Sequence, residues 1–268
     1  MPELPEIASR AREMNAALPG KTISAVEVLQ PKCLNIPVED FTRALTGASI
    51  QEVSYRGKWI LTRTSQGWLL INLGMGGEIL LTTRAAMPEK YRIVFDFSDG
   101  TCLAINFWWF GYAHFAMQDA LAGHEPTAKL GQDALTLTSE DLTRIFQGQR
   151  GKVKTLLLDQ TRVSGIGNAY IHDILFFARV HPLRPANSLS QEEISGLVDG
   201  IQKGLRPSLE KGGAFYEKTL RGENGGFTED QIVIGYRENA PCPVCGTPIE
   251  KIKTGGTSSF ICPTCQQL

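Results

Sequence analysis

The first six residues, Met1-Pro2-Glu3-Leu4-Pro5-Glu6, hold groups that can carry out chemistry. Once Met1 is removed, the chain begins with a proline whose nitrogen is a free secondary amine. An α-amino group has a pKa of about 7.7–8.0, so much of it is unprotonated near neutral pH. Such an amine can attack an aldehyde carbon and form a Schiff base. Glu3 and Glu6 follow closely enough to move protons there. A helix start explains Pro5 and Glu6 equally well, but not Pro2 and Glu3.

Four of the six cysteines lie in the last 27 residues, as two Cys-x-x-Cys pairs. The pairs are Cys242/Cys245 and Cys262/Cys265, with 16 residues between the inner cysteines. This spacing predicts a tetrahedral four-thiolate zinc ribbon, with iron as the alternative metal. Four protein ligands leave no open position on the metal, so the zinc ion is predicted to be structural. It would hold a small hairpin over 249–260.

Two segments carry groups suited to binding an anion. In Val163-Ser-Gly165-Ile-Gly167-Asn168 the glycines can turn backbone N–H groups toward a phosphate, and Lys154 and Asn168 can add donors. An ordinary turn between helices is the alternative, because no strand precedes the segment and no third glycine follows. The second segment is Arg56-Gly57-Lys58-Trp59, where Lys58 either grips a phosphate or is simply exposed.

Two short segments carry large apolar side chains that the core of a β-sheet cannot all bury. Met75 lies in Leu73-Gly-Met-Gly-Gly77, and four consecutive aromatics occupy 107–110. Because successive strand residues point to opposite faces, at least one aromatic is expected outside the core. An apolar side chain on a loop can wedge between base pairs. For Phe107 and Trp108 we expect burial in the core.

The composition is that of an ordinary globular protein, with 42% hydrophobic and 21% charged residues and a net charge of −1. The chain of 268 residues is long enough for two domains. Without an apolar leader or a run of 18 apolar residues, we expect it to be neither exported nor membrane-spanning. One basic segment, with Arg150, Lys152, Lys154 and Arg162 opposed only by Asp159, is either a nucleic-acid patch or a solvated helix face.

The predicted elements change character twice along the chain. Helical spacing of Ile7, Ala11, Met14 and Leu18 predicts a first helix that ends at Pro19-Gly20. Short strands then run to about 117, with turn signals such as Ser65-Gln66-Gly67 and Ser98-Asp99-Gly100 between them, and predict an antiparallel sandwich or barrel. Helices follow, two of them opened by capping boxes at Thr138/Asp141 and Ser190/Glu193. Pro207 should bend or divide the last helix, and 221–230 is expected to be a mobile polar loop.

In this order, the segments resemble the formamidopyrimidine-DNA glycosylase / endonuclease VIII family of base-excision repair enzymes. The resemblance spans nearly the whole chain, and the formamidopyrimidine branch is the nearer. It rests on Pro2-Glu3-Leu4-Pro5-Glu6, Gly57-Lys58, Leu73-Gly74-Met75, Phe110-Gly111, Leu157-Leu158-Asp159-Gln160, Gly165-Ile166-Gly167-Asn168 and the four cysteines. It implies an α+β multidomain fold: an N-terminal helix on a β-sandwich, a helix–two-turn–helix domain and a zinc-ribbon hairpin.

The resemblance also implies a role for each matching residue. Pro2 would attack C1′ of a flipped damaged nucleotide, an imine would form, and β,δ-elimination would cut the strand. Glu3 would exchange protons at the sugar and Glu6 would support the site. Lys58 and Asn168 would hold phosphates, while Met75 and Phe110 would fill the gap left by the flipped nucleotide.

The sequence departs from the family pattern at positions that hold DNA. The family's Asp-Pro-Arg-Arg-Phe-Gly is Asn-Phe-Trp-Trp-Phe-Gly over 106–111, so Trp109 replaces an arginine that hydrogen-bonds the unpaired base. Indole has one donor and no fork, so Trp109 cannot reproduce that contact, but it can stack on a base. Thr257 replaces the zinc-finger arginine that clamps a phosphate, and Asp173 and Ala8 replace glutamates. We therefore expect an unusual lesion preference.

We accordingly predict a bifunctional DNA glycosylase/AP lyase, with a non-catalytic binder of damaged or branched DNA as the alternative. The predicted domains are a catalytic β-sandwich at 1–117, a connector at 118–137, a helix–two-turn–helix DNA-binding domain at 138–235 and a zinc finger at 236–268. The expected partner is damaged DNA. We expect a cytoplasmic monomer that joins the nucleoid when bound to DNA.

Overall fold

The structure is a computed structural model and describes residues 1–108 and 110–268. The chain forms two compact units. The first comprises Met1–Lys129 and Leu209–Gly226, and the second comprises Leu130–Ser208 and Phe227–Leu268. Residues 209–226 thus pack with the N-terminal part of the chain. The boundaries at 117, 137 and 235 remain predictions.

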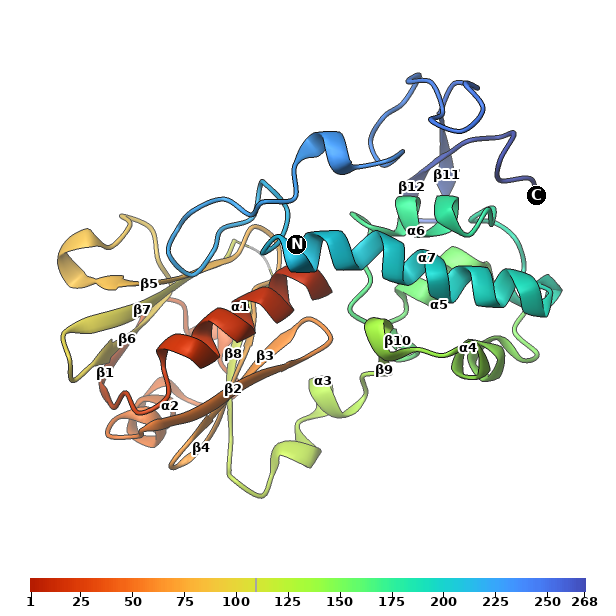
Figure 1. Cartoon of the computed structure of the whole chain (residues 1–268). Helices are drawn as coiled ribbons and strands as arrows, with labels where there is room; N and C mark the ends of the chain where they lie inside the picture. Colours follow the sequence, from red (N-terminus) through yellow and green to blue (C-terminus); the bar gives the residue numbers. More distant parts are fainter. Residues whose placement is uncertain (109) are drawn as a thin grey trace. The chain divides into compact units, whose positions relative to one another are not determined.

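The first unit is built on two antiparallel four-stranded sheets, as predicted (Figure 1). One sheet has the order β1-β6-β7-β5 and the other β2-β3-β4-β8. Turns at 65–66 and 98–100 close the hairpins β3–β4 and β6–β7, where glycines and polar residues had predicted them. The strands are β1 (Ile23–Val28), β2 (Ile50–Arg56), β3 (Trp59–Thr64), β4 (Gly67–Asn72), β5 (Glu78–Thr83), β6 (Ile93–Phe97), β7 (Thr101–Asn106) and β8 (Tyr112–Ala116).

The two sheets share one hydrophobic core, to which both contribute alternate residues. Ile60 and Leu69 come from one sheet, and Phe95 and Ile105 from the other. Helix α1 (Leu4–Ala17) packs on β2 and β3 and buries the apolar stripe that predicted it, Ile7, Ala11, Met14 and the following Leu18. The side chain of Asn15 accepts the amide hydrogen of Val53 at 2.8 Å, which fixes the helix to β2. The sandwich therefore positions the first residues of the chain.

Some features of this unit differ from the predictions. Helix α2 (Val38–Leu45) was not predicted, because it is short and buries only Phe41 and Leu45. Phe107 is buried as expected, but burial of Trp108 was a wrong prediction, since its side chain is 67% exposed. Trp108 follows the end of β7 and is no longer held to the sheet's alternation. Cys33 and Cys102 are buried free thiols.

The second unit is mainly helical. Its elements are α4 (Ser139–Phe146), α5 (Val153–Leu158), α6 (Ile171–Phe177), most of α7 (Gln191–Glu210), the short parallel pair β9 (Gln132–Asp133) and β10 (Val163–Ser164), and the hairpin β11 (Glu250–Thr254) and β12 (Thr257–Ile261). A four-residue helix, α3 (Glu125–Ala128), precedes it in the first unit. Both predicted capping boxes are present.

Pro207 does not divide helix α7, which continues to Glu210. The proline lies in the last turn, where it removes one backbone hydrogen bond and only three helical residues follow it. Gly212 and Gly213, at φ values of +79° and +107°, lie just beyond the end of the helix. Across the described residues, none of the helices has the length and apolar character needed to span a membrane.

Candidate active site

The start of α1 holds Pro2, Glu3 and Glu6 in buried positions. One carboxylate oxygen of Glu6 accepts the amide hydrogen of Glu3 at 2.8 Å, and the other accepts that of Ala214 at 3.1 Å. Glu3 and Glu6 together form a capping box at the helix start. Glu6 therefore anchors the N-terminal segment to the loop that follows α7.

Lys58 lies at the tip of the β2–β3 hairpin. Gly57 has a φ of +55°, which a side chain rarely tolerates, so this tight turn favours glycine. Burial lowers the pKa of the Lys58 ammonium, and the charges of Glu3 and Glu6 partly offset this effect. The hairpin thus brings the Lys58 charge near both carboxylates.

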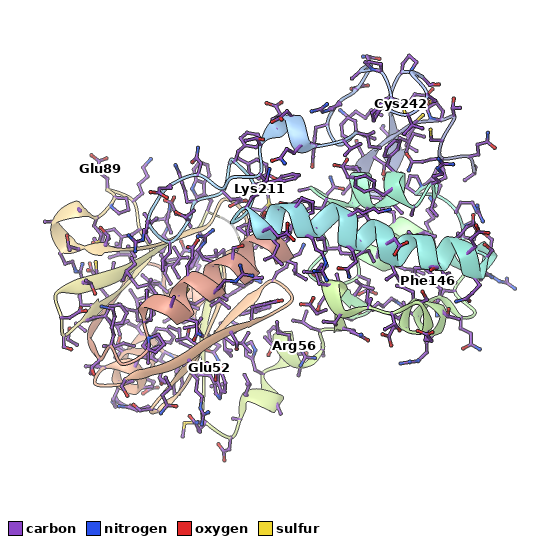
Figure 2. All side chains as sticks on the ribbon, viewed as in Figure 1. Glu52, Arg56, Glu89, Phe146, Lys211 and Cys242 are labelled. Atoms are coloured by element: carbon purple, nitrogen blue, oxygen red, sulfur yellow. The ribbon has the colours of Figure 1, made fainter. Side chains whose placement is uncertain are left out.

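Asn72 connects this turn to the next functional loop. Its side-chain amide donates to the carbonyl of Lys58 at 3.1 Å, and its side-chain oxygen accepts the amide hydrogen of Gly74 at 3.0 Å. The sequence analysis did not identify Asn72, because it ends a strand with no motif of its own. Figure 2 shows Arg56, the residue before the turn, at the end of the same hairpin.

Glu217 was also missed by the sequence analysis. Its carboxylate lies 3.9 Å from the nitrogen of Met1, and the side chain is only 11% exposed. Burial raises the pKa of Glu217 to about 7, and the terminal ammonium, Glu6, Arg10 and Glu3 all act on it. No sequence signal could have found it, since more than 200 residues separate Glu217 from the N-terminus.

Met75 and Phe110 are carried by two tight loops that are joined to each other. Their side chains are 50% and 69% exposed. The amide of Trp108 donates to the carbonyl of Met75 at 3.4 Å. Phe110 has a φ of +56°, an uncommon conformation for a side-chain-bearing residue and one often found at functional sites. Trp109, predicted to stack on DNA, lies outside the described residues.

In the second unit, the turn that holds Asn168 is organised by Gln160. The Gln160 side chain donates to the carbonyls of Leu158 and Ile166 at 2.9 and 2.8 Å and accepts from the amide of Gly165 at 2.9 Å. The side-chain amide of Asn168 donates to the hydroxyl of Tyr236 at 3.4 Å. This is a long hydrogen bond that a phosphate oxygen can replace at little cost.

Lys154 does not lie on the surface, and the structure does not support the predicted phosphate contact. Its side chain is buried, with 2% exposed. Its ammonium donates to four oxygens of the zinc-ribbon hairpin at 2.7–3.1 Å: the hydroxyls of Thr254, Thr257 and Ser259 and the carbonyl of Ser258. Burial lowers its pKa to about 8. Lys154 therefore fixes the hairpin, and only Thr257 of this group is exposed.

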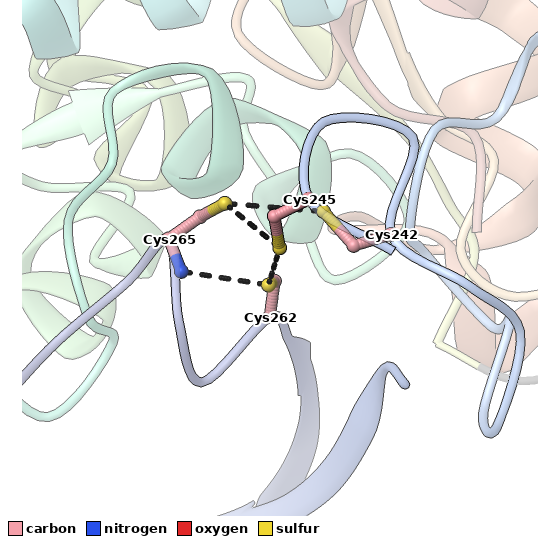
Figure 3. A group of neighbouring side chains, drawn as sticks. All are labelled: Cys242, Cys245, Cys262 and Cys265. Atoms are coloured by element: carbon pink, nitrogen blue, oxygen red, sulfur yellow. Dashed lines mark hydrogen bonds between the residues drawn. The ribbon is translucent and has the colours of Figure 1, made fainter. Parts of the chain in front are cut away.

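The four predicted metal ligands come together at one point. Cys242, Cys245, Cys262 and Cys265 place all their sulfurs within 4.8 Å of one another (Figure 3). Three of the separations are 3.4, 3.6 and 3.9 Å. Thiolates at about 2.3 Å from a tetrahedral zinc ion are about 3.8 Å apart, so the group fits that ion.

Comparisons with known proteins agree with this arrangement. Three family models match the chain: the formamidopyrimidine-DNA glycosylase N-terminal domain over 1–106, the formamidopyrimidine-DNA glycosylase H2TH domain over 125–219, and a zinc finger found in FPG and IleRS over 240–268. A formamidopyrimidine-DNA glycosylase of Exiguobacterium sibiricum is 35% identical over 274 residues, which cover 100% of this chain and 99% of that protein. The chain belongs to the formamidopyrimidine-DNA glycosylase family.

Other members of the family extend this finding. The formamidopyrimidine-DNA glycosylase of Bacillus subtilis is 35% identical over 99% of both chains. The Lactococcus lactis Fpg, solved with DNA containing an abasic site, has a TM-score of 0.92 and 28% identity, covering 99% of this chain and 100% of that one. The same protein was solved with DNA containing N7-benzyl-Fapy-dG, again with a TM-score of 0.92. The fold and the structural zinc ion predicted from the sequence are thus confirmed.

Proposed function

We propose that this protein removes damaged bases from DNA and cleaves the strand at the resulting abasic site. The observation that carries the proposal is the buried Pro2-Glu3 pair at the start of α1, with the Lys58 charge near Glu3 and Glu6, in a member of this family. A proline amine is the only nucleophile that this arrangement requires. Names of full-length relatives support the same activity.

In the proposed reaction, Pro2 attacks C1′ of the damaged nucleotide and the base leaves. Glu3 exchanges protons at the sugar, and the imine that forms allows β,δ-elimination. Glu6 holds Glu3 and the loop at Ala214 in place, because both of its carboxylate oxygens accept backbone hydrogens. Lys58 supplies positive charge for a phosphate beside the lesion.

The proposed DNA contacts combine family features with departures from them. Met75 and Phe110 fill the gap left by the flipped nucleotide, as their exposure permits. Asn168 binds a phosphate through its amide. Thr257 offers a hydroxyl where the family has an arginine, so this phosphate contact is weaker, since a neutral hydrogen bond is about half as strong as a charge-assisted one.

We infer that the opposite base is poorly discriminated, because Trp109 lacks the donor fork of arginine. Stacking of an indole on a base contributes about 1–3 kcal/mol but tolerates any base. Excision rates for one lesion placed opposite C, A, G and T should therefore agree within about tenfold. Differences of several orders of magnitude would reject this inference.

The non-catalytic binder expected as the alternative is not favoured. Binding DNA requires neither a terminal proline nor an acid beside it, and both are present in buried positions. The similarity to named glycosylases also covers the whole chain. We propose that the protein acts on damaged DNA as a monomer.

Borohydride trapping on a duplex with an abasic site tests the proposal. Reduction of the imine should give a covalent protein–DNA adduct. The adduct should disappear in Pro2→Gly and in protein that retains Met1, while binding of the duplex persists. Asp119→Asn, at an exposed position, serves as a control and should leave trapping unchanged. Failure to trap any abasic or damaged DNA with the mature protein would reject the enzyme.

A further inference from the structure

Besides Glu3, a second carboxyl group lies close to the terminal amine. It belongs to Glu217, in the Leu209–Gly226 part of the first unit. Glu217 Oε1 lies 3.9 Å from the Met1 nitrogen. Removal of Met1 moves the chain terminus to Pro2, at most about 3.8 Å further along the backbone. The Pro2 nitrogen therefore lies at most about 8 Å from Glu217 Oε1. Proton exchange requires the two groups to meet directly or through one water molecule.

The loop around Glu217 holds it rigidly. The amide of Glu217 donates to the carbonyl of Ala214, and its carbonyl accepts from the amide of Gly225, both at 2.9 Å. A Cβ atom on Gly225 would lie 2.3 Å from the carbonyl oxygen of Gly213, so this close approach requires glycine. Gly225, from the loop predicted to be mobile, thus packs against the backbone at 213–217 and fixes the segment that carries Glu217.

The charges around Glu217 suit proton exchange with an amine. Glu6 and Arg10 of α1, the N-cap residue Glu3 and the terminal ammonium all act on its carboxyl group. The Arg10 guanidinium is occupied by Glu13 and by the Gly212 carbonyl, and both Glu6 oxygens accept backbone hydrogens. Burial raises the pKa of Glu217 to about 7, close to the value of about 7.7–8.0 for an α-amino group. Because these two pKa values differ by about 1, the state with the proton on Glu217 is only about tenfold less populated than the state with the proton on the amine.

We propose that Glu217 is the proton acceptor that activates Pro2, and this inference rests on the proposed function. The Pro2 ammonium gives one proton to a Glu217 oxygen, and the freed electron pair forms the bond to C1′. At a damaged nucleotide, the bond from C1′ to the base breaks, and its electron pair leaves with the base, which takes up the proton. At an abasic aldehyde, the C=O pair moves to the oxygen, which takes up the same proton. In this division of roles, Glu3 exchanges protons with the sugar, and Glu217 exchanges a proton with the Pro2 nitrogen.

Glu217→Gln tests this role, with Glu223→Gln as the matched control on the same loop. Glu223 is exposed, and the control should behave like the unchanged protein. All proteins are prepared without Met1, checked by mass, and compared by thermal unfolding. Single-turnover trapping on an abasic duplex is measured from pH 5.5 to 9.5. The reactive form holds one proton shared by the amine and the carboxyl, so the rate of the unchanged protein should fall on both sides of a maximum.

In Glu217→Gln the rate at neutral pH should fall by about 100-fold. Its pH profile should become a single rise to a plateau, because only the amine then titrates. A purely structural role would lower the rate without changing the profile. A rate within twofold of the unchanged protein, or an unaltered profile, would overturn the proposal.

A titration independent of activity separates this proposal from the proposed function. NMR of ¹³C-proline-labelled protein follows the Pro2 ring carbons between pH 5 and 10. Loss of the carboxylate should lower the pKa of the Pro2 amine by about 1, since an opposite charge within 4–6 Å stabilises the ammonium. An unchanged titration in Glu217→Gln would overturn the role of Glu217. Absence of trapping by the unchanged protein would instead reject the enzyme itself.

Discussion

The half-buried His114 and the buried His124 form a pair that packs against Trp59, the residue after Lys58. Nδ1 of His114 lies 2.8 Å from Nε2 of His124, and the two rings lie 5.4 and 5.2 Å from that of Trp59. Burial, with a smaller contribution from the neighbouring His124, lowers the pKa of His114 to about 4. Burial also lowers the pKa of His124. Both imidazoles are therefore neutral in the folded protein at pH 7.

This pair predicts a loss of stability in acid. The folded pKa of His114 lies below the unfolded value of about 6.5, so the unfolded chain binds more protons between about pH 6.5 and 4. Stability must then fall as the pH falls through this window. From pH 7 to 5 we expect a loss of about 1–2 kcal/mol, after allowance for solvent near the half-buried ring.

Urea unfolding at pH 7 and 5 measures this loss. His114→Gln keeps a hydrogen-bonding group beside His124 but cannot titrate, so it should lose about 1–2 kcal/mol less than the unchanged protein over this range. Acid effects on the zinc thiolates are common to both proteins and cancel in the comparison. Equal losses in the two proteins would show that His114 is not responsible.

At the scale of elements, Asn72 joins the Lys58 turn to the Met75 loop. It makes one hydrogen bond to each, so the two loops are positioned together. Asn72→Ala should remove both bonds and weaken binding of an abasic duplex by about 5–30-fold, equivalent to about 1–2 kcal/mol. Fluorescence anisotropy at constant salt measures the Kd.

Asn35 provides a matched control in the same sandwich. Its side chain also bridges backbone groups, donating to the carbonyl of Phe115 at 2.9 Å and accepting its amide hydrogen at 2.8 Å. Asn35→Ala should cost similar stability while leaving the Kd unchanged. If both variants bind DNA equally well, Asn72 has only a structural role.

The sequence allowed the prediction of elements whose signal is local. The α1 stripe and the hairpin turns at 65–66 and 98–100 are encoded by neighbouring residues, and both are confirmed. The exposure of Trp108 and the undivided α7 depend on where an element ends, which periodicity does not determine. Glu217, Asn72 and the burial of Lys154 depend on contacts between distant segments, which a single sequence does not reveal.

At the scale of the whole molecule, the fold is retained more fully than the residues expected to hold DNA. A TM-score of 0.92 accompanies only 28% identity with the Lactococcus lactis protein. Burial and zinc binding tolerate many side chains of suitable size, whereas a bidentate contact to a base or phosphate requires arginine. Changes at Trp109 and Thr257 can therefore alter substrate choice without changing the architecture.

Removal of the zinc ion should destabilise the second unit and leave the first unit folded. Cys242 and Cys262 belong to a hydrophobic cluster with Phe176 of α6 and Phe260 of the hairpin. Lys154 also holds that hairpin through four hydrogen bonds. Without the metal, the four cysteines no longer close the ribbon, and the buried Lys154 ammonium loses its partners.

Chelation of zinc followed by hydrogen exchange tests this separation. Protection should be lost over 236–268 and near Lys154 and His172, whose ring packs against Phe260 at 5.2 Å. Peptides from β1–β8 should keep their protection, because the sandwich core contains residues from the first unit only. Affinity for an abasic duplex should fall at least tenfold, while the pH titration of the Pro2 amine stays as it was. Loss of protection throughout β1–β8 would show instead that the two units unfold as one.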